Sequence, residues 1–426
     1  MRRGCAGLLL ASLWSITLLA AIAVRGQLGE RPFSGSLDHP AIGYAVQQTT
    51  DAVAALNKSL ADKPAQLRFD PQSGYLGSIL EALHIPIESQ LLLFSKTGVQ
   101  RVRTSPANPR ALFFNDAVVV GYIRGAPFLE VAVLDPRQGA IFYTLNQEDG
   151  PSRQLTRAGS CLTCHESYST LAVPGFLTRS QATGSDGQTA RRLGEFIVDH
   201  RTPFEQRWGG WYVTAARGLR HMGNHPIALP ETPETTLVER DPGLESVSGR
   251  VDTRGYPTPY SDVVALMVFE HQARMMNLLT RLGWEVRVAV FDNRADFSSA
   301  PLRDAVDEFV DYLLFVDEAV LPSPLSGTSG FATSFTAHGL RDQKGRSLRA
   351  FDLRTRLFRY PCSYMIYSDA FDQLPPVARD AIYRRLWQIL SGDERGSRYA
   401  RLPAGTRRAI IDILRDTRPG LPAYFR

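Results

Sequence analysis

Five consecutive residues, Cys161-Leu162-Thr163-Cys164-His165, constrain this chain more than any other feature of its sequence. Two thiols three positions apart lie on one side of a helical turn, and an imidazole follows directly. Only four cysteines and eight histidines occur in 426 residues, so a chance occurrence of this spacing is rare. Cys-x-x-Cys-His is typical of covalent haem c attachment, with both thiols bonded to the porphyrin and the histidine bound to the iron.

In these five residues the chain resembles the c-type cytochromes. The resemblance implies that Cys161 and Cys164 carry thioether bonds to one haem c, that His165 is the proximal iron ligand, and that the protein handles electrons. It does not extend beyond residue 165, and the chain is much longer than a minimal electron carrier.

Three other uses of the cysteine pair fit the sequence less well. A zinc site needs four ligands, and the pentapeptide with the distant Cys362 could supply them, but no second closely spaced cysteine pair is present. A redox-active dithiol opens a helix directly after a strand, whereas residues 157–160 predict a loop. A disulfide across only two intervening residues closes a strained ring.

The N-terminal segment predicts export. Arg2 and Arg3 precede an apolar run from Ala6 to Val24, and small residues near its end are typical of a signal-peptide cleavage site. If uncleaved, the run is long enough to anchor the protein in the inner membrane. In both cases we expect the folded body in the periplasm or on the outer face of the cytoplasmic membrane, where haem c is attached.

Composition and charge are those of an ordinary folded protein. Hydrophobic residues make up 44% and charged residues 21% of the chain. The formal net charge is +5, and Arg2, Arg3 and Arg25 in or beside the N-terminal segment contribute three of these charges. No nucleic-acid partner is expected from this balance.

The pattern of the chain predicts an α+β fold, with a strand-rich N-terminal half that carries the haem motif and a helix-rich C-terminal half. We divide it into a signal peptide or anchor at 1–26, an α+β region at 27–225 with the motif at 161–165, a proline-rich connection at 226–261, and a mainly helical region at 262–426.

Within these regions, short apolar runs between turn residues predict an antiparallel meander, and helical periodicity predicts amphipathic helices. The expected strands are 91–94, 117–123, 128–134, 140–145, 208–213 and 285–291, and residues 178–191 are an expected polar loop. The expected helices are 41–60, packed on the sheet, and 262–282, 306–320, 376–390 and 407–414.

The sixth iron ligand has two histidine candidates. His221 lies in a loop beside Met222, and His271 lies on the apolar stripe of the helix expected over 262–282, together with Met267 and Met275. A histidine ligand lowers the reduction potential, a methionine raises it, and an open position admits small molecules. We predict His221 or His271 as the distal ligand, and the three methionines come next.

Three further features of the sequence have structural interpretations, two of them beside functional ones. His200, between two charged neighbours, predicts a side chain paired at the surface or placed behind an iron ligand. The seven basic residues between 341 and 359 predict a solvated face, a clamp for haem propionates or a surface for an acidic redox partner. Cys362 predicts a buried thiol.

Together these features predict an exported monohaem c-type cytochrome that acts in electron transfer with a redox partner protein. Alternative functions are a haem-dependent oxidoreductase or a small-ligand sensor with an open iron site, or a haem-bearing subunit of a respiratory complex. The sequence shows no motif for a particular reaction.

Replacing both cysteines of the motif, Cys161→Ala with Cys164→Ala, is expected to abolish covalent haem attachment, because no thioether bond can form. Haem staining after denaturing electrophoresis measures this, and the wild type should keep one haem per chain. Cys362→Ala is the control and should keep its haem. A wild-type protein that loses its colour on acid-acetone extraction would contradict the prediction.

Overall fold

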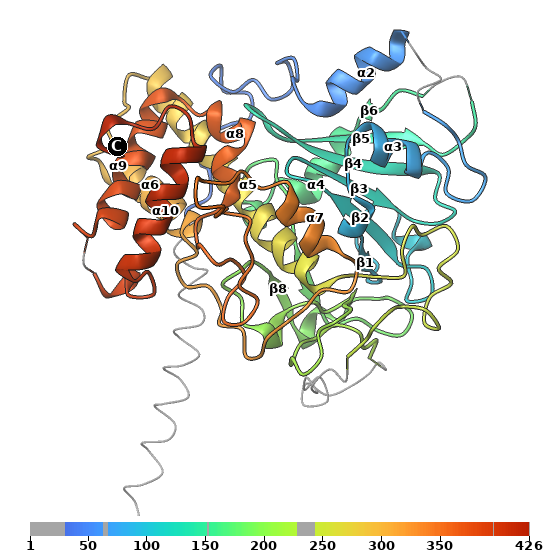
Figure 1. The fold of residues 1–426 in the computed structure, drawn as a ribbon. Helices are drawn as coiled ribbons and strands as arrows, with labels where there is room; N and C mark the ends of the chain where they lie inside the picture. Colours follow the sequence, from blue (N-terminus) through green and yellow to red (C-terminus); the bar gives the residue numbers. More distant parts are fainter. Residues whose placement is uncertain (1–29, 63–66, 151–152, 228–242, 395, 426) are drawn as a thin grey trace, which may run out of the picture.

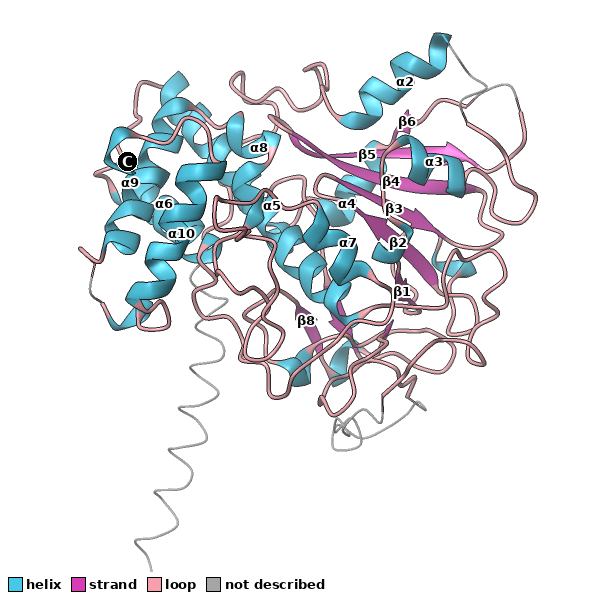
Figure 2. Cartoon of the chain, viewed as in Figure 1, coloured by secondary structure: helices cyan, strands magenta, loops and turns pink. Residues whose placement is uncertain are grey.

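A computed structural model describes residues 30–62, 67–150, 153–227, 243–394 and 396–425. The expected signal peptide or anchor at 1–26 lies outside the described residues, as do residues 228–242 of the expected connection. Among the helices in the described ranges, none is long and apolar enough to cross a membrane. The predicted α+β class is confirmed, with a sheet in the N-terminal half and helices in the C-terminal half (Figure 1, Figure 2).

Seven strands form one antiparallel sheet in the order β6-β5-β4-β3-β2-β1-β9. Strands β2 to β5 follow one another along the chain because each short turn returns the chain beside the strand it has just left. A separate hairpin pairs β7 with β8. The bounds are β1 Leu91–Leu93, β2 Arg110–Phe114, β3 Val118–Tyr122, β4 Phe128–Asp135, β5 Gly139–Asn146, β6 Thr156–Arg157, β7 Arg179–Gln181, β8 Glu195–Ile197 and β9 Trp211–Tyr212.

The two faces of the sheet are covered differently. Alternate residues of a strand point to opposite faces, so Val131 of β4 joins a cluster with α2 (Ala52–Asp62) and α3 (Leu76–Ala82) on one side. On the other side, Phe114 of β2 packs against α5 (Val263–Phe291), with its ring centroid 5.0 Å from that of Phe269. Helix α5 therefore lies between the sheet and the helices of the C-terminal end, α6 (Ala300–Leu313), α9 (Pro376–Ser391) and α10 (Ala404–Thr417) (Figure 1).

Helix α5 is the core element of the C-terminal half. Residues 263–284 are all buried, as expected for a helix that neighbours surround on every side. Its N-terminus is capped by Asp262, whose Oδ1 accepts hydrogen bonds from the N–H groups of Val264 and Ala265. The other helices are α6 Ala300–Leu313, α7 Phe331–Ala337, α8 Asp369–Asp372, α9 Pro376–Ser391 and α10 Ala404–Thr417, and α6, α9 and α10 gather on the side away from the sheet (Figure 1).

The expected strands at 91–94, 117–123, 128–134 and 140–145 are confirmed as β1, β3, β4 and β5. Residues 178–191, expected as a loop, contain β7 instead, because its three residues find a partner in β8. Strand β2 was not predicted.

Three expectations for helices and strands are wrong. The helix expected over 41–60 begins only at Ala52, because the Asp51 carboxylate caps it there, accepting from the N–H groups of Val53 and Ala54. The strand expected at 285–291 is the end of α5, since extending an existing helix costs less than starting a new element.

The third error concerns the helix expected over 306–320. It ends at Leu313, because Phe315 and Asp317 take left-handed backbone angles, with φ of 55° and 63°. An L-residue in this region cannot continue a right-handed helix.

Asp262→Ala should lower the free energy of unfolding by about 3 kcal/mol. The side chain is fully buried, and its Oδ2 also accepts from the N–H groups of Thr328 and Ser329, so its loss leaves several donors unpaired. Urea denaturation measures the change. Ser299→Ala is the control, because Ser299 precedes α6 without a side-chain cap. Equal losses in the two variants would contradict this role of Asp262.

Candidate haem-binding site

The two thiols of the pentapeptide lie on one turn that leaves the sheet beside β5. Ala158 N–H donates to the carbonyl of Phe142, and the short helix α4 (Leu162–His165) follows the turn at Gly159–Cys161. Both cysteines are free thiols, Cys161 half-buried and Cys164 exposed. Burial is the main reason that the pKa of Cys161 is raised. Two free thiols one turn apart are available for thioether bonds.

His165 is held in one orientation by a backbone carbonyl. Its Nδ1 lies 2.9 Å from the oxygen of Gly175, and the N–H of Gly175 donates in return to the carbonyl of His165 at 2.8 Å. The ring also packs on Phe142, with centroids 4.8 Å apart. Burial lowers the pKa of His165, so the imidazole is neutral at pH 7. A carbonyl can only accept, so Nδ1 carries the hydrogen and Nε2 keeps its lone pair.

The loop that holds His165 is itself fixed by helix α5. The side-chain amide of Asn277 accepts from the N–H of Phe176 and donates to its carbonyl, both at 2.8 Å. A Cβ atom at Gly175 would lie 2.4 Å from Oδ1 of Asn277, so only glycine fits beside this amide. The orientation of His165 thus depends on a residue more than one hundred positions further along the chain.

Two partly buried apolar residues of the sheet belong to the same packed face as Cys161. Leu112 of β2 and Ala132 of β4 are half-buried, and with Cys161 they pack at the margin of the cluster that contains Phe142. Gly121 lies on the same face between their strands and is buried under the ion pair of Arg110 and Glu130, because a Cβ atom there would lie 3.3 Å from Nε of Arg110 and 3.4 Å from Oε2 of Glu130. Leu112 and Ala132 are thus the half-buried apolar residues of this face that a porphyrin could contact.

Arg110 and Arg179 bring positive charge to this site. Arg110 pairs with Glu130, and Arg179 pairs with Glu195 at 3.0 Å. Both guanidinium charges act on His165 and help to lower its pKa. Among the described residues, neither buried Nε atom has a hydrogen-bond partner. Buried donors that lack acceptors fit the carboxylates of haem propionates.

His271 is already bonded through both ring nitrogens. Its Nδ1 lies 2.8 Å from Nδ1 of His200, and its Nε2 lies 2.7 Å from Oγ of Ser363. Burial lowers the pKa of His271 to about 3, so the ring is neutral. It could reach an iron only by giving up one of these bonds. The expected surface position of His200 is wrong, because its ring is buried against His271 while its neighbours Asp199 and Arg201 pair with each other.

His221 and Met222 are tied to the hairpin that carries Arg179. His221 is buried, its Nδ1 accepts from the N–H of Gly223 at 3.0 Å, and its ring edge meets Trp208. Met222 accepts a hydrogen bond from Oγ of Ser180 in β7, at 3.7 Å from its sulfur. The structure therefore connects the 221–222 loop to a strand of the site, but the residues found against the His165 ring are Phe142 and Gly175.

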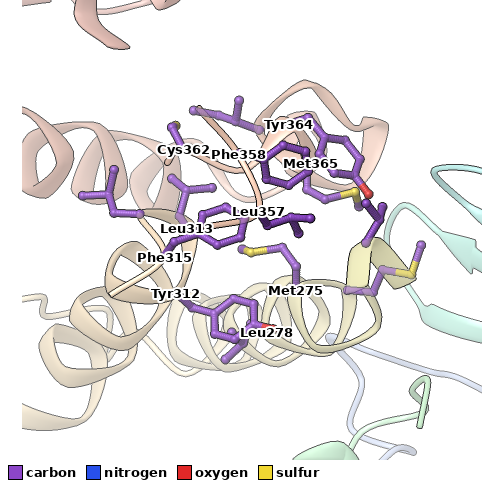
Figure 3. Close-up of a cluster of buried hydrophobic side chains, with 14 of the residues drawn as sticks. Met275, Leu278, Tyr312, Leu313, Phe315, Leu357, Phe358, Cys362, Tyr364 and Met365 are labelled. Atoms are coloured by element: carbon purple, nitrogen blue, oxygen red, sulfur yellow. The ribbon is translucent and has the colours of Figure 1, made fainter. Parts of the chain in front are cut away.

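The remaining candidates lie in other surroundings. Met275 lies in an apolar cluster with Phe358 and Cys362 (Figure 3). Cys362 is confirmed as a buried thiol, and burial raises its pKa to about 12. Among the described residues, no group of three or more His, Cys, Asp or Glu side chains could hold a metal ion. In the basic stretch 341–359, Arg346 pairs with two aspartates and Arg349 with Asp116.

Comparison with known proteins adds nothing to these observations. No protein-family model matches the chain, and searches of curated proteins and of solved structures find no significant match. The interpretation of the site therefore depends on its own residues. The sequence did not predict its supporting residues, since no motif connects positions so far apart: Arg110, Phe142, Gly175, Arg179 and Asn277.

Gly175→Ala and Asn277→Ala should each lower the free energy of unfolding by about 2 kcal/mol or more, through a clash and through unpaired backbone groups respectively. In the double variant the clash disappears, so its loss should be at least about 1 kcal/mol smaller than the sum of the two. Urea denaturation of all three variants measures this coupling. Additive losses would show that the two residues act independently.

Proposed function

We propose that the protein is an exported monohaem c-type cytochrome that transfers electrons. The observation that carries the proposal is the orientation of His165 next to two free thiols on one turn. A histidine that donates its Nδ1 hydrogen to a backbone carbonyl presents its Nε2 lone pair in a fixed direction, which is how proteins hold metal-ligating histidines.

In this proposal, Cys161 and Cys164 hold the porphyrin edge through thioether bonds, and His165 supplies the proximal nitrogen. Arg110 and Arg179, which pair with Glu130 and Glu195, would supply further hydrogen-bond donors to the propionates. The haem, when bound, supplies one-electron redox chemistry. The hydrogen bond to Gly175 makes the imidazole a stronger electron donor, which favours oxidised iron and a lower potential.

Haem c is attached to proteins outside the cytoplasm. The proposed cofactor therefore also supports a location in the periplasm or on the outer face of the cytoplasmic membrane. The charged and apolar pattern of residues 1–26 agrees with export. The partner would be a redox protein that exchanges one electron at a time.

One observation favours a second function. Both ring nitrogens of His271 are bonded inside the protein, so one of the two expected distal ligands is not free to bind iron. If the 221–222 loop also leaves the iron open, the site would admit a small ligand. The protein would then be a haem-dependent oxidoreductase or a sensor.

Electronic absorption spectra of the purified holoprotein distinguish the two functions. For the carrier we expect a six-coordinate low-spin iron that does not bind CO. His221→Ala or Met222→Ala should convert it to a high-spin, CO-binding iron, whereas His271→Ala should leave it low-spin. His338→Ala is the control, because His338 is exposed and bonds only locally, to Ser334.

A wild-type iron that is already high-spin and binds CO would overturn the carrier function and support the oxidoreductase or sensor. A low-spin wild type whose spectrum changes only in His271→Ala would show that His271 leaves Ser363 to bind the iron.

A further inference from the structure

A cleft of about 830 Å³ opens near the end of α6, outside the haem site described above. Binding sites for small molecules usually have volumes of about 300–1,000 Å³. Three distant parts of the chain meet here, 201–205, 314–322 and 397–402, together with residues 355 and 356. Its apolar lining includes Phe204, Leu314, Phe315 and Leu402.

Part of the backbone that lines this cleft has a strained conformation. Phe315 and Asp317 both line it, and both have left-handed backbone angles. The ring of Phe315 is fixed from behind, because it stacks on His271 with centroids 4.1 Å apart and belongs to the apolar cluster of Figure 3. Strained residues persist where their surroundings hold them, and they are more frequent at functional sites.

The arginines of the cleft fall into two pairs. Arg201 and Arg398 each form ion pairs with aspartates, Arg201 with Asp199 and Arg398 with Asp311. Arg356 and Arg401 donate instead to backbone carbonyls, Arg401 to that of Glu318 at 2.7 Å and Arg356 to that of Arg401 at 3.5 Å. In the described ranges, neither of these two guanidinium groups lies within 4.0 Å of a carboxylate.

Three carboxyl groups line the cleft, Glu205, Asp317 and Glu318. Asp317 lies 3.7 Å from Arg398, and Glu318 is only 8% exposed. Its Oε1 accepts from the N–H of Leu357 at 2.8 Å. Burial is the main reason that its pKa is raised to about 7, so it is partly protonated at neutral pH. Among the described residues, none of these three carboxyl groups lies within 4.0 Å of the guanidinium group of Arg356 or Arg401, so both arginines lack a carboxylate partner in the cleft.

We propose that this cleft binds a small organic anion with an apolar body. The anionic group pairs with Arg356 and Arg401, and the apolar body lies against Phe315 and Leu402. The lining contains no residue of the pentapeptide and neither Arg110 nor Arg179, so binding of a probe can be tested apart from the proposed electron transfer.

Isothermal titration calorimetry of the full-length protein with 2-naphthoate tests the proposal, and 2-naphthamide serves as the neutral probe of the same shape. We expect one naphthoate per chain and at least about tenfold weaker binding of the amide, because a charged hydrogen-bonded pair exceeds about 1.4 kcal/mol in such a site. Arg356→Met with Arg401→Met should reduce naphthoate affinity to that of the amide.

Two further variants complete the test. Ala319→Trp should abolish binding of both probes, because Ala319 lines the cleft and the indole would fill it. Arg354→Met with Arg359→Met is the control, since both arginines are exposed and lie outside the lining. No binding of naphthoate to the wild type, equal binding of the two probes, or unchanged affinity in the Arg356 and Arg401 double variant would each overturn the proposal.

Discussion

Helix α5 places charged and amide side chains inside the protein, and the rest of the structure depends on how these groups are paired. Glu270 pairs with Arg207 at 2.9 Å, and Arg281 pairs with Glu308 at 2.7 Å. Removing one partner of a buried ion pair leaves an uncompensated charge and costs about 3–5 kcal/mol. Arg207 precedes α5 in the chain and Glu308 follows it. The charges on α5 can therefore be buried only when both halves of the chain are in place.

The same requirement sets the geometry of the candidate haem site. Asn277 is a buried amide on α5, and it satisfies its hydrogen bonds with the backbone of Phe176. That contact fixes the loop whose carbonyl at Gly175 orients His165. An amide that is needed to bury a helix therefore also directs the imidazole of His165. The segment that contains the pentapeptide is short and partly exposed, yet it is held in place by a helix whose residues 263–284 are all buried.

The pairing also explains why His271 is a weak candidate for the iron. Its position on the apolar stripe of α5 is the position from which a ligand could be presented, but a buried imidazole needs partners of its own. His200 and Ser363 supply them. The ring of Phe315, two residues after the end of α6, stacks on His271 and also lines the cleft. The packing around His271 therefore shapes a second site.

The amino-acid sequence by itself determined the features that depend on neighbours within a few positions. Short apolar runs between turn residues predicted four strands of the sheet, Asp262 predicted the start of α5, and the spacing of Cys161, Cys164 and His165 predicted the candidate cofactor. In each case the physical cause is local, a strand pleat, a capped helix end or one helical turn. The α+β division of the chain follows from the same local signals.

Only the tertiary structure decided which polar groups meet. His271 finds partners 71 and 92 positions away, and Phe176 is held by Asn277 from 101 positions away. It also decided that residues 285–291 extend α5 rather than form a strand, since an isolated strand would have no partner at that place. Hydrogen-bond partners and burial are properties of the packed chain, and a local pattern carries no information about which distant residue will satisfy a buried donor.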